Sequence, residues 1–164
     1  MVEPRCLALA DDGVVPNSRL PLLLYRAALA GGGEAQLAAM FTGNGWGGLW
    51  VDGIYPFQHY HATAHEVLGI ACGSARVQLG GPRGPVIEVG AGDAVVIPAG
   101  AGHCRLGQSP DLSVVGAYPA GQVADLRRAT ASDRTMALPL LARVPTPSTD
   151  PIHGAAGPLL RLWR

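Results

Sequence analysis

Turn-forming residues divide this chain into short apolar runs, and that rhythm constrains the fold more than any other feature. Several runs alternate apolar with polar residues or carry β-branched side chains, as strands do. Glycine (23 residues) and proline (14 residues) occur throughout the 164 residues rather than in one linker. The pattern predicts an all-β sandwich or barrel in a single domain. The runs lie at 20–29, 66–72, 74–80, 85–90, 93–98 and 112–118.

Two segments outside these runs have helical character. Helix formers extend from Glu34 to Phe41 and Gly43 supplies a stop, which predicts a short N-terminal helix. A second short helix is expected within 122–132, and the proline-rich end of the chain predicts an extended C-terminal arm. The expected organisation is a strand and helix extension packed on the barrel (1–50), a barrel core (51–122), and a helix followed by the arm (123–164).

Charge and cysteine content argue against several classes of function. Arginine supplies all twelve basic residues and balances twelve acidic ones, so no lysine is available for a Schiff base. The zero net charge gives no reason to expect nucleic acid or an anionic membrane as a partner. The three cysteines form no C-x-x-C pair, which argues against a zinc ribbon. With no leader and no span of membrane length recognisable, we expect a cytoplasmic protein.

Histidines gather in the segment 53–73, in a chain that is otherwise poor in charge. His59 and His61 are two residues apart, so on a strand their imidazoles point to one face and can converge on a metal ion. Glu66 lies five residues past His61, which would place it on the opposite face of a continuous strand. A turn or bulge is therefore expected between them, so that Glu66 faces inward from the next strand.

Neighbouring His65 and Glu66 cannot both face the interior of the barrel. The set Glu66, Leu68 and Ile70 is bulkier than the set that starts at His65, so it belongs in the core. Glu66 is then the better metal ligand, and His65 is expected to lie behind the ligands or at an interface.

A second segment, 92–107, offers a third imidazole. Gly92 closes a turn into an apolar strand, Pro98 and Gly100 force another turn, and His103 opens the strand that follows. Three histidines with one carboxylate make a mixed nitrogen and oxygen site that suits a divalent ion such as Fe, Mn or Ni, with Zn and Cu as alternatives. Such a site keeps positions open for a substrate.

These two segments resemble the two motifs of the cupin superfamily. The first motif, G-x5-H-x-H-x4-E-x6-G, is matched by Gly53, His59, His61, Glu66 and Gly73. The second, G-x5-P-x-G-x2-H-x3-N, is matched through His103, with Gly107 in place of the final Asn. The resemblance implies a double-stranded β-helix, the RmlC-like jelly-roll barrel, with a metal held by His59, His61, Glu66 and His103. Longer stretches are similar to the YjlB-like branch of small bacterial cupins, which implies terminal extensions but no particular reaction.

Further residues are candidates for the pocket or its surroundings. Strand parity places Tyr55 and Phe57 on the face of His59, and Arg105 on the face of His103, where it could hold a carboxylate or lie in solvent. The complete set of pocket or outer candidates is Tyr55, Phe57, His65, Leu68 and Arg105.

Three functions are compatible with this pattern. The favoured one is a metal-dependent enzyme, a dioxygenase or an isomerase, acting on a small organic molecule. The alternative is a non-catalytic cupin that binds or senses a small ligand or metal, and a metal-free sugar-nucleotide epimerase is disfavoured because it would not need the four ligands. Low charge and apolar end segments predict a homodimer in which the ends cover one another.

Overall fold

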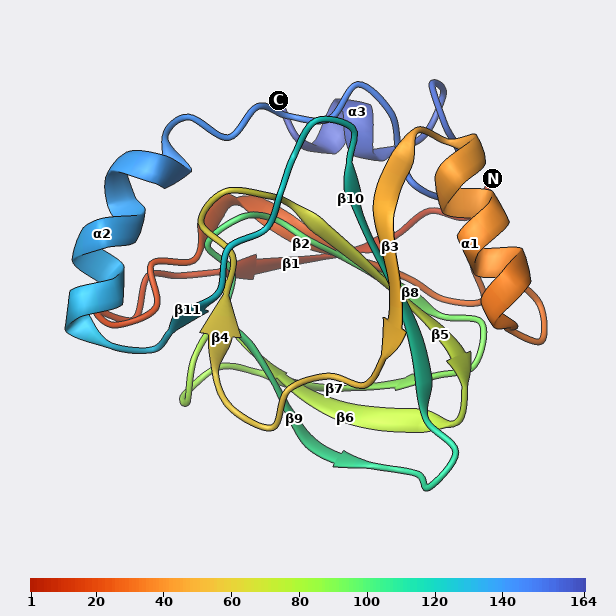
Figure 1. Cartoon of the computed structure of the whole chain (residues 1–164), viewed down its shortest axis with the longest axis horizontal. Coiled ribbons are helices and arrows are strands. Elements are labelled where there is room, and N and C mark those ends of the chain that lie inside the picture. Colours follow the sequence, from red (N-terminus) through yellow and green to blue (C-terminus); the bar gives the residue numbers. More distant parts are fainter.

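The apolar runs form strands in the computed structural model, which describes all 164 residues (Figure 1). The strands are β1 (Arg5–Leu9), β2 (Ser18–Tyr25), β3 (Trp46–Asp52), β4 (His59–Tyr60), β5 (Glu66–Cys72), β6 (Ser74–Leu79), β7 (Val86–Gly90), β8 (Ala94–Ile97), β9 (His103–Gln108), β10 (Ser113–Pro119) and β11 (Arg127–Arg128). The helices are α1 (Glu34–Gly43), α2 (Ala131–Leu141) and α3 (Leu159–Leu162).

Two antiparallel sheets face each other, which confirms the predicted jelly-roll fold. The larger sheet has the order β1-β2-β8-β5-β10-β3 and the smaller one β11-β4-β9-β6-β7. The chain passes repeatedly from one sheet to the other, so strands that follow one another in sequence seldom pair. This exchange brings the ends of β4, β5 and β9 to one region of the interior.

The central strands of the larger sheet are buried on both faces, and they divide their side chains between two cores. On β5, Leu68 and Ile70 join the interior core between the sheets, as the parity argument predicted. Val67 and Ala71 point the other way, into a second core that includes residues of α1 and of the C-terminal segment. Two buried faces explain why the run is apolar without interruption after Glu66.

Helix α1 lies directly on the back of the larger sheet. The sequence predicted this helix over 34–41, and it extends to Gly43. Gly69 of β5 permits the close packing, because a Cβ there would stand 2.9 Å from Phe41 Cζ and 3.0 Å from Leu37 Cδ2. We refer to α1, the C-terminal segment and the buried face beneath them as the back layer.

Two expectations about the chain's organisation were wrong. The segment 1–50 is not an extension outside the barrel, because it supplies β1, β2 and most of β3 to the larger sheet, where β2 pairs with β8. The second helix does not lie within 122–132: it begins at Ala131, where the side chain of Thr130 accepts a hydrogen bond from the Asp133 amide and caps the first turn.

The C-terminal arm covers its own chain. Trp163 is buried in the back layer, and its indole nitrogen donates to the Pro21 carbonyl at 2.8 Å. The Tyr25 hydroxyl donates to Asp150 at 2.5 Å and ties the arm to β2. None of the three helices has the length and apolar character needed to cross a membrane.

Candidate metal centre

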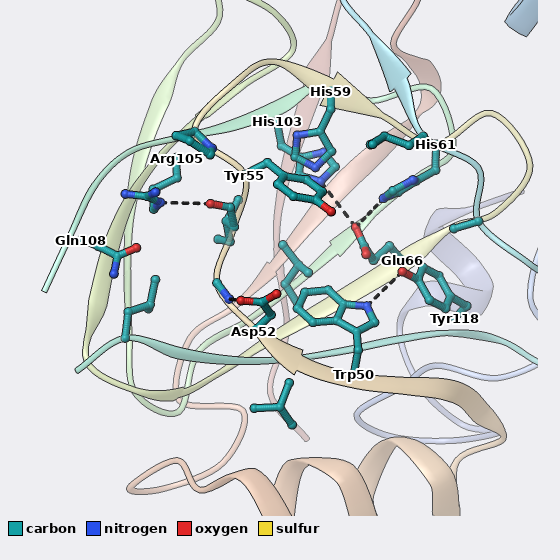
Figure 2. A pocket seen from close by; sticks show the side chains of 18 of the residues that line it. Trp50, Asp52, Tyr55, His59, His61, Glu66, His103, Arg105, Gln108 and Tyr118 are labelled. Carbon is teal, nitrogen blue, oxygen red and sulfur yellow. Dashed lines mark hydrogen bonds and ion pairs between the residues drawn. The ribbon is translucent and has the colours of Figure 1, made fainter. Parts of the chain in front are cut away.

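Three histidines converge inside the barrel from the smaller sheet (Figure 2). His59 on β4 is paired directly with His103 on β9, and His61 is the first residue after β4. One ring nitrogen from each lies within 4.8 Å of the other two. Glu66 comes from the opposite, larger sheet, since the chain crosses between the sheets over residues 61–65. The cluster is thus assembled from both layers of the sandwich.

The outer nitrogen of each imidazole is held by a backbone carbonyl. Nδ1 of His59 contacts the Phe57 oxygen at 3.0 Å, and Nδ1 of His103 contacts the Ala101 oxygen at 3.2 Å. Nδ1 of His61 forms a short hydrogen bond with the Asp125 carbonyl. Because a carbonyl only accepts, each Nδ1 carries the proton, and each neutral ring keeps a lone pair on Nε2. This is the arrangement by which proteins orient histidine ligands.

The carboxylate of Glu66 lies among these lone pairs. Its Oε2 is 3.2 Å from His61 Nε2 and 3.4 Å from His103 Nε2. Carboxylate oxygens and unprotonated nitrogens are all acceptors, so they repel one another at this distance unless a positive charge lies between them. The arrangement therefore requires either extra protons on the imidazoles or a bound cation.

Burial and charge act together on the titration of the cluster. Burial, and then the neighbouring His103, lower the pKa of His59 to about 3, so that this ring is neutral at ordinary pH. Burial opposes charge on His61, but the hydrogen bond and charge of Glu66 outweigh it and raise the pKa of His61. Burial likewise disfavours ionised Glu66, but His103 and His61 more than compensate and lower its pKa. Glu66 is therefore an anion, and His61 and His103 are its nearest partners.

The cluster forms one wall of a cavity of about 790 Å³. Of the expected pocket residues, Tyr55, Leu68 and Arg105 line this cavity together with the three histidines and Glu66. The Tyr55 ring stands edge-on to His59, with ring centroids 5.1 Å apart. Figure 2 shows Arg105 on the wall formed by β9.

The other two candidates, Phe57 and His65, do not line the cavity. Phe57 does not line the cavity, because residues 53–58 are not in a strand and do not follow strand parity. Its ring stacks on Tyr55, and the Arg128 guanidinium covers it at 3.5 Å from the ring centroid. His65 points to the back layer, where it lies against Trp163 and accepts a hydrogen bond from the Ala99 amide.

Sequence patterns did not reveal the residues that come to the cavity through the fold alone. Tyr118 on β10 lines it, and its hydroxyl accepts a hydrogen bond of 2.9 Å from the Trp50 indole. The Trp50 contact leaves the hydroxyl proton of Tyr118 for an acceptor, and the carboxylate of Glu66 is one such acceptor. Burial, and then the charge of Glu66, raise the pKa of Tyr118, so the phenol stays protonated.

Asp125 supports the cluster from behind His61. Its carbonyl holds His61 Nδ1, while its carboxylate accepts from the Ala62 amide at 2.6 Å and from Arg127 at 2.7 Å. These contacts fix the carbonyl against the imidazole, so Asp125 sets the orientation of a candidate ligand without touching the interior face of the cluster. The only sequence signal was its place shortly after a strand, which is too common to be informative.

Comparison with known proteins identifies a relative over nearly the whole chain. No family model matches. The "uncharacterized protein YjlB" of Bacillus subtilis is 41% identical over 154 residues, which cover 93% of this chain and 92% of that protein.

Solved structures give weaker likenesses. An acireductone dioxygenase from Bacillus anthracis, with a cadmium ion in its active centre, aligns with a TM-score of 0.39 and 18% identity over 56% of this chain and 62% of its own. A DUF861 family protein from Thermotoga maritima aligns with a TM-score of 0.31 and 23% identity, over 46% of this chain and 77% of its own. At these scores, nothing about ligands or activity transfers. The jelly roll with its histidine cluster is a cupin fold, and the extent of identity with YjlB shows that the chain belongs to the YjlB family.

Proposed function

We propose that His59, His61, Glu66 and His103 bind one divalent metal ion. The observation that carries this proposal is the approach of the Glu66 carboxylate to the Nε2 atoms of His61 and His103. The Nδ1 atom of each of these rings faces a backbone carbonyl and therefore carries the proton. A divalent cation converts this repulsion into coordination and satisfies all the lone pairs at once. The mixed donor set suits Fe, Mn, Ni or Zn.

The activity that we propose is that of a metal-dependent enzyme, a dioxygenase or an isomerase, acting on a small organic molecule. The bound ion would supply Lewis-acid or redox chemistry. The chain contributes an open cavity of about 790 Å³, aromatic walls, and the Tyr118 hydroxyl, which is held by Trp50 and has a proton to donate. A phenol in this position would hold or protonate a substrate oxygen.

Metal analysis followed by activity screening tests the proposal. Protein purified without an affinity tag should contain close to one equivalent of a divalent metal, and the Fe(II) form should consume oxygen with a small organic substrate if it is a dioxygenase. Tyr118→Phe should retain the metal and lose most turnover. Protein that neither retains nor takes up a divalent ion would rule out both the site and the activity.

A non-catalytic binder of a small ligand or metal is the alternative. The same cavity would serve it, and it predicts ligand binding without turnover in the metal-loaded protein. A sugar-nucleotide epimerase without metal remains disfavoured, because it leaves the contact between Glu66 and the imidazoles without a purpose.

We also propose a homodimer, although the apolar ends of the chain do not need a partner to cover them. The apolar ends are covered within one chain by Trp163 and its surroundings. What supports association now is β3, an edge strand on which Leu49 and Val51 are 44% and 53% exposed. Light scattering coupled to size exclusion would decide between one copy and two.

A further inference from the structure

An arginine whose terminal nitrogens have no partner lies in the wall of the cavity. Arg105 is the one arginine among the cavity-lining side chains, and the chain has no lysine. Its Nε donates to the Ile54 carbonyl at 3.0 Å, which fixes the side chain in place. It takes part in none of the chain's ion pairs. The two terminal nitrogens of the guanidinium are thus free to meet a ligand.

A β-bulge brings a second polar side chain to the same wall. The register between β6 and β9 runs from Val77–Arg105 to Arg76–Gly107, so Leu106 is an extra residue on β9. In a regular strand, positions 105 and 108 would face opposite sides. The bulge leaves Leu106 exposed and lets both Arg105 and Gln108 line the cavity (Figure 2). Gln108 forms no side-chain hydrogen bond within the chain, so its amide is also available.

The acidic residues of the cavity do not neutralise this arginine. Asp52 accepts from the Gly53 amide at 2.7 Å, and Asp125 pairs with Arg127 at 2.7 Å. Glu66 is engaged by His61 and His103. The positive charge of Arg105 therefore favours an anionic ligand, and its planar fork matches a carboxylate in two parallel hydrogen bonds.

The spacing along β9 limits the size of that ligand. Arg105 follows His103 by two residues, so their Cα atoms are roughly 7 Å apart at a rise of about 3.3 Å per residue. We infer that the substrate is a small bifunctional carboxylic acid, whose carboxylate binds Arg105 and Gln108 while a second oxygen reaches the histidine cluster. This inference rests on the proposed function for the metal end and on Arg105 alone for the acid end.

Calorimetric titration of the metal-loaded protein would test the acid end. The probes are the linear dicarboxylates from malonate to adipate, each with its monomethyl ester. One chain length should bind best, and its ester more weakly. Arg105→Gln should weaken that dicarboxylate by about tenfold to a hundredfold, as expected for a charge-assisted hydrogen bond. Arg105→Lys should restore part of the loss because it keeps the charge without the fork.

The matched control is Arg76→Gln, which removes an exposed arginine from the neighbouring strand β6 and should leave binding unchanged. Equal affinity of the wild type and Arg105→Gln for every dicarboxylate would overturn the inference, as would a loss that Arg76→Gln reproduces. Co(II) absorption of the same samples reports the metal end separately. If dicarboxylate binding depends on Arg105 in protein that takes up no metal, the carboxylate subsite is supported and the proposed metal function is wrong.

Discussion

Two histidines four residues apart, His61 and His65, have opposite surroundings although both are shielded from solvent. His61 faces the cavity, where its Nε2 meets Glu66 and its Nδ1 is held by a carbonyl. His65 faces the back layer, where its Nδ1 accepts from the Ala99 amide and its ring lies against Trp163. The comparison shows that burial does not distinguish a ligand from a structural histidine. The two histidines differ in the backbone group at Nδ1, which is a carbonyl acceptor for His61 and an amide donor for His65, and in the contact of Nε2 with Glu66, which only His61 makes.

Metal content should separate the two histidines most strongly. We expect His61→Ala to lower metal affinity by at least about a hundredfold, because it removes a coordinate bond and not only an outer partner. His65→Ala should retain the metal, since its ring lies on the other face of the larger sheet. Elemental analysis after dialysis measures both, and equal loss in the two variants would break the comparison.

Substitutions in the back layer should lower stability more than substitutions at the cavity, the reverse of their effect on metal binding. Trp163→Ala should cost about 3–5 kcal/mol of unfolding free energy, because it removes a buried indole from a packed core. Trp50→Ala should cost less, since this half-buried side chain borders open space. Urea denaturation of the metal-free proteins provides the measurement. A larger loss for Trp50 would mean that the cavity, rather than the back layer, holds the fold together.

A smaller effect on metal affinity is expected behind the cluster. Asp125→Ala removes the hydrogen bonds that fix the carbonyl beside His61 and should weaken metal binding by about tenfold, the lower range for outer partners of a ligand. Competition with a chromophoric chelator measures the affinity. Glu88→Ala, at an exposed position of strand β7, is the control and should change nothing. Unchanged affinity in Asp125→Ala would show that His61 needs no such support.

The smallest effect concerns alkaline pH and tests the back layer. Burial, and then the hydrogen bond to Asp150, raise the pKa of Tyr25, so the phenol stays neutral in the fold while the unfolded chain ionises near pH 10. Stability due to this shift is complete below about pH 10 and falls above it by about 1.4 kcal/mol per pH unit. Tyr25→Phe should be less stable at neutral pH but lose less stability with rising pH. A parallel decline in both proteins would place Tyr25 outside this linkage.

Local sequence patterns predicted many of the strands, helix α1 and the inward face of β5, but not β1, β3 or β11. They succeeded because alternation and turn residues act over a few positions, and because Leu68 and Ile70 differ in bulk from their neighbours. The metal ligands remain a prediction, and their side chains meet as the spacing suggested. The parity argument failed at Phe57 for a physical reason: it assumed a strand where the chain forms a loop.

Residues brought together by topology could not be predicted in this way. Tyr118 and Asp125 lie far from the histidines in sequence and reach them only because β10 and the segment after it border the cavity. The path of the C-terminal arm was equally hidden, since an apolar end can cover its own chain or a neighbour. The cap formed by Thr130 and Asp133 was a visible signal for α2, but the predicted helix was placed before it.

The origin of the four candidate ligands has a mechanical consequence. His59, His61 and His103 come from the smaller sheet or its continuation, whereas Glu66 alone comes from the larger one. An ion bound by the histidines alone would be attached to one sheet, whereas an ion that also binds Glu66 would link the two sheets. Coordination by the carboxylate would then limit how far the two sheets can separate. It would thereby limit how readily a molecule enters or leaves the space between them.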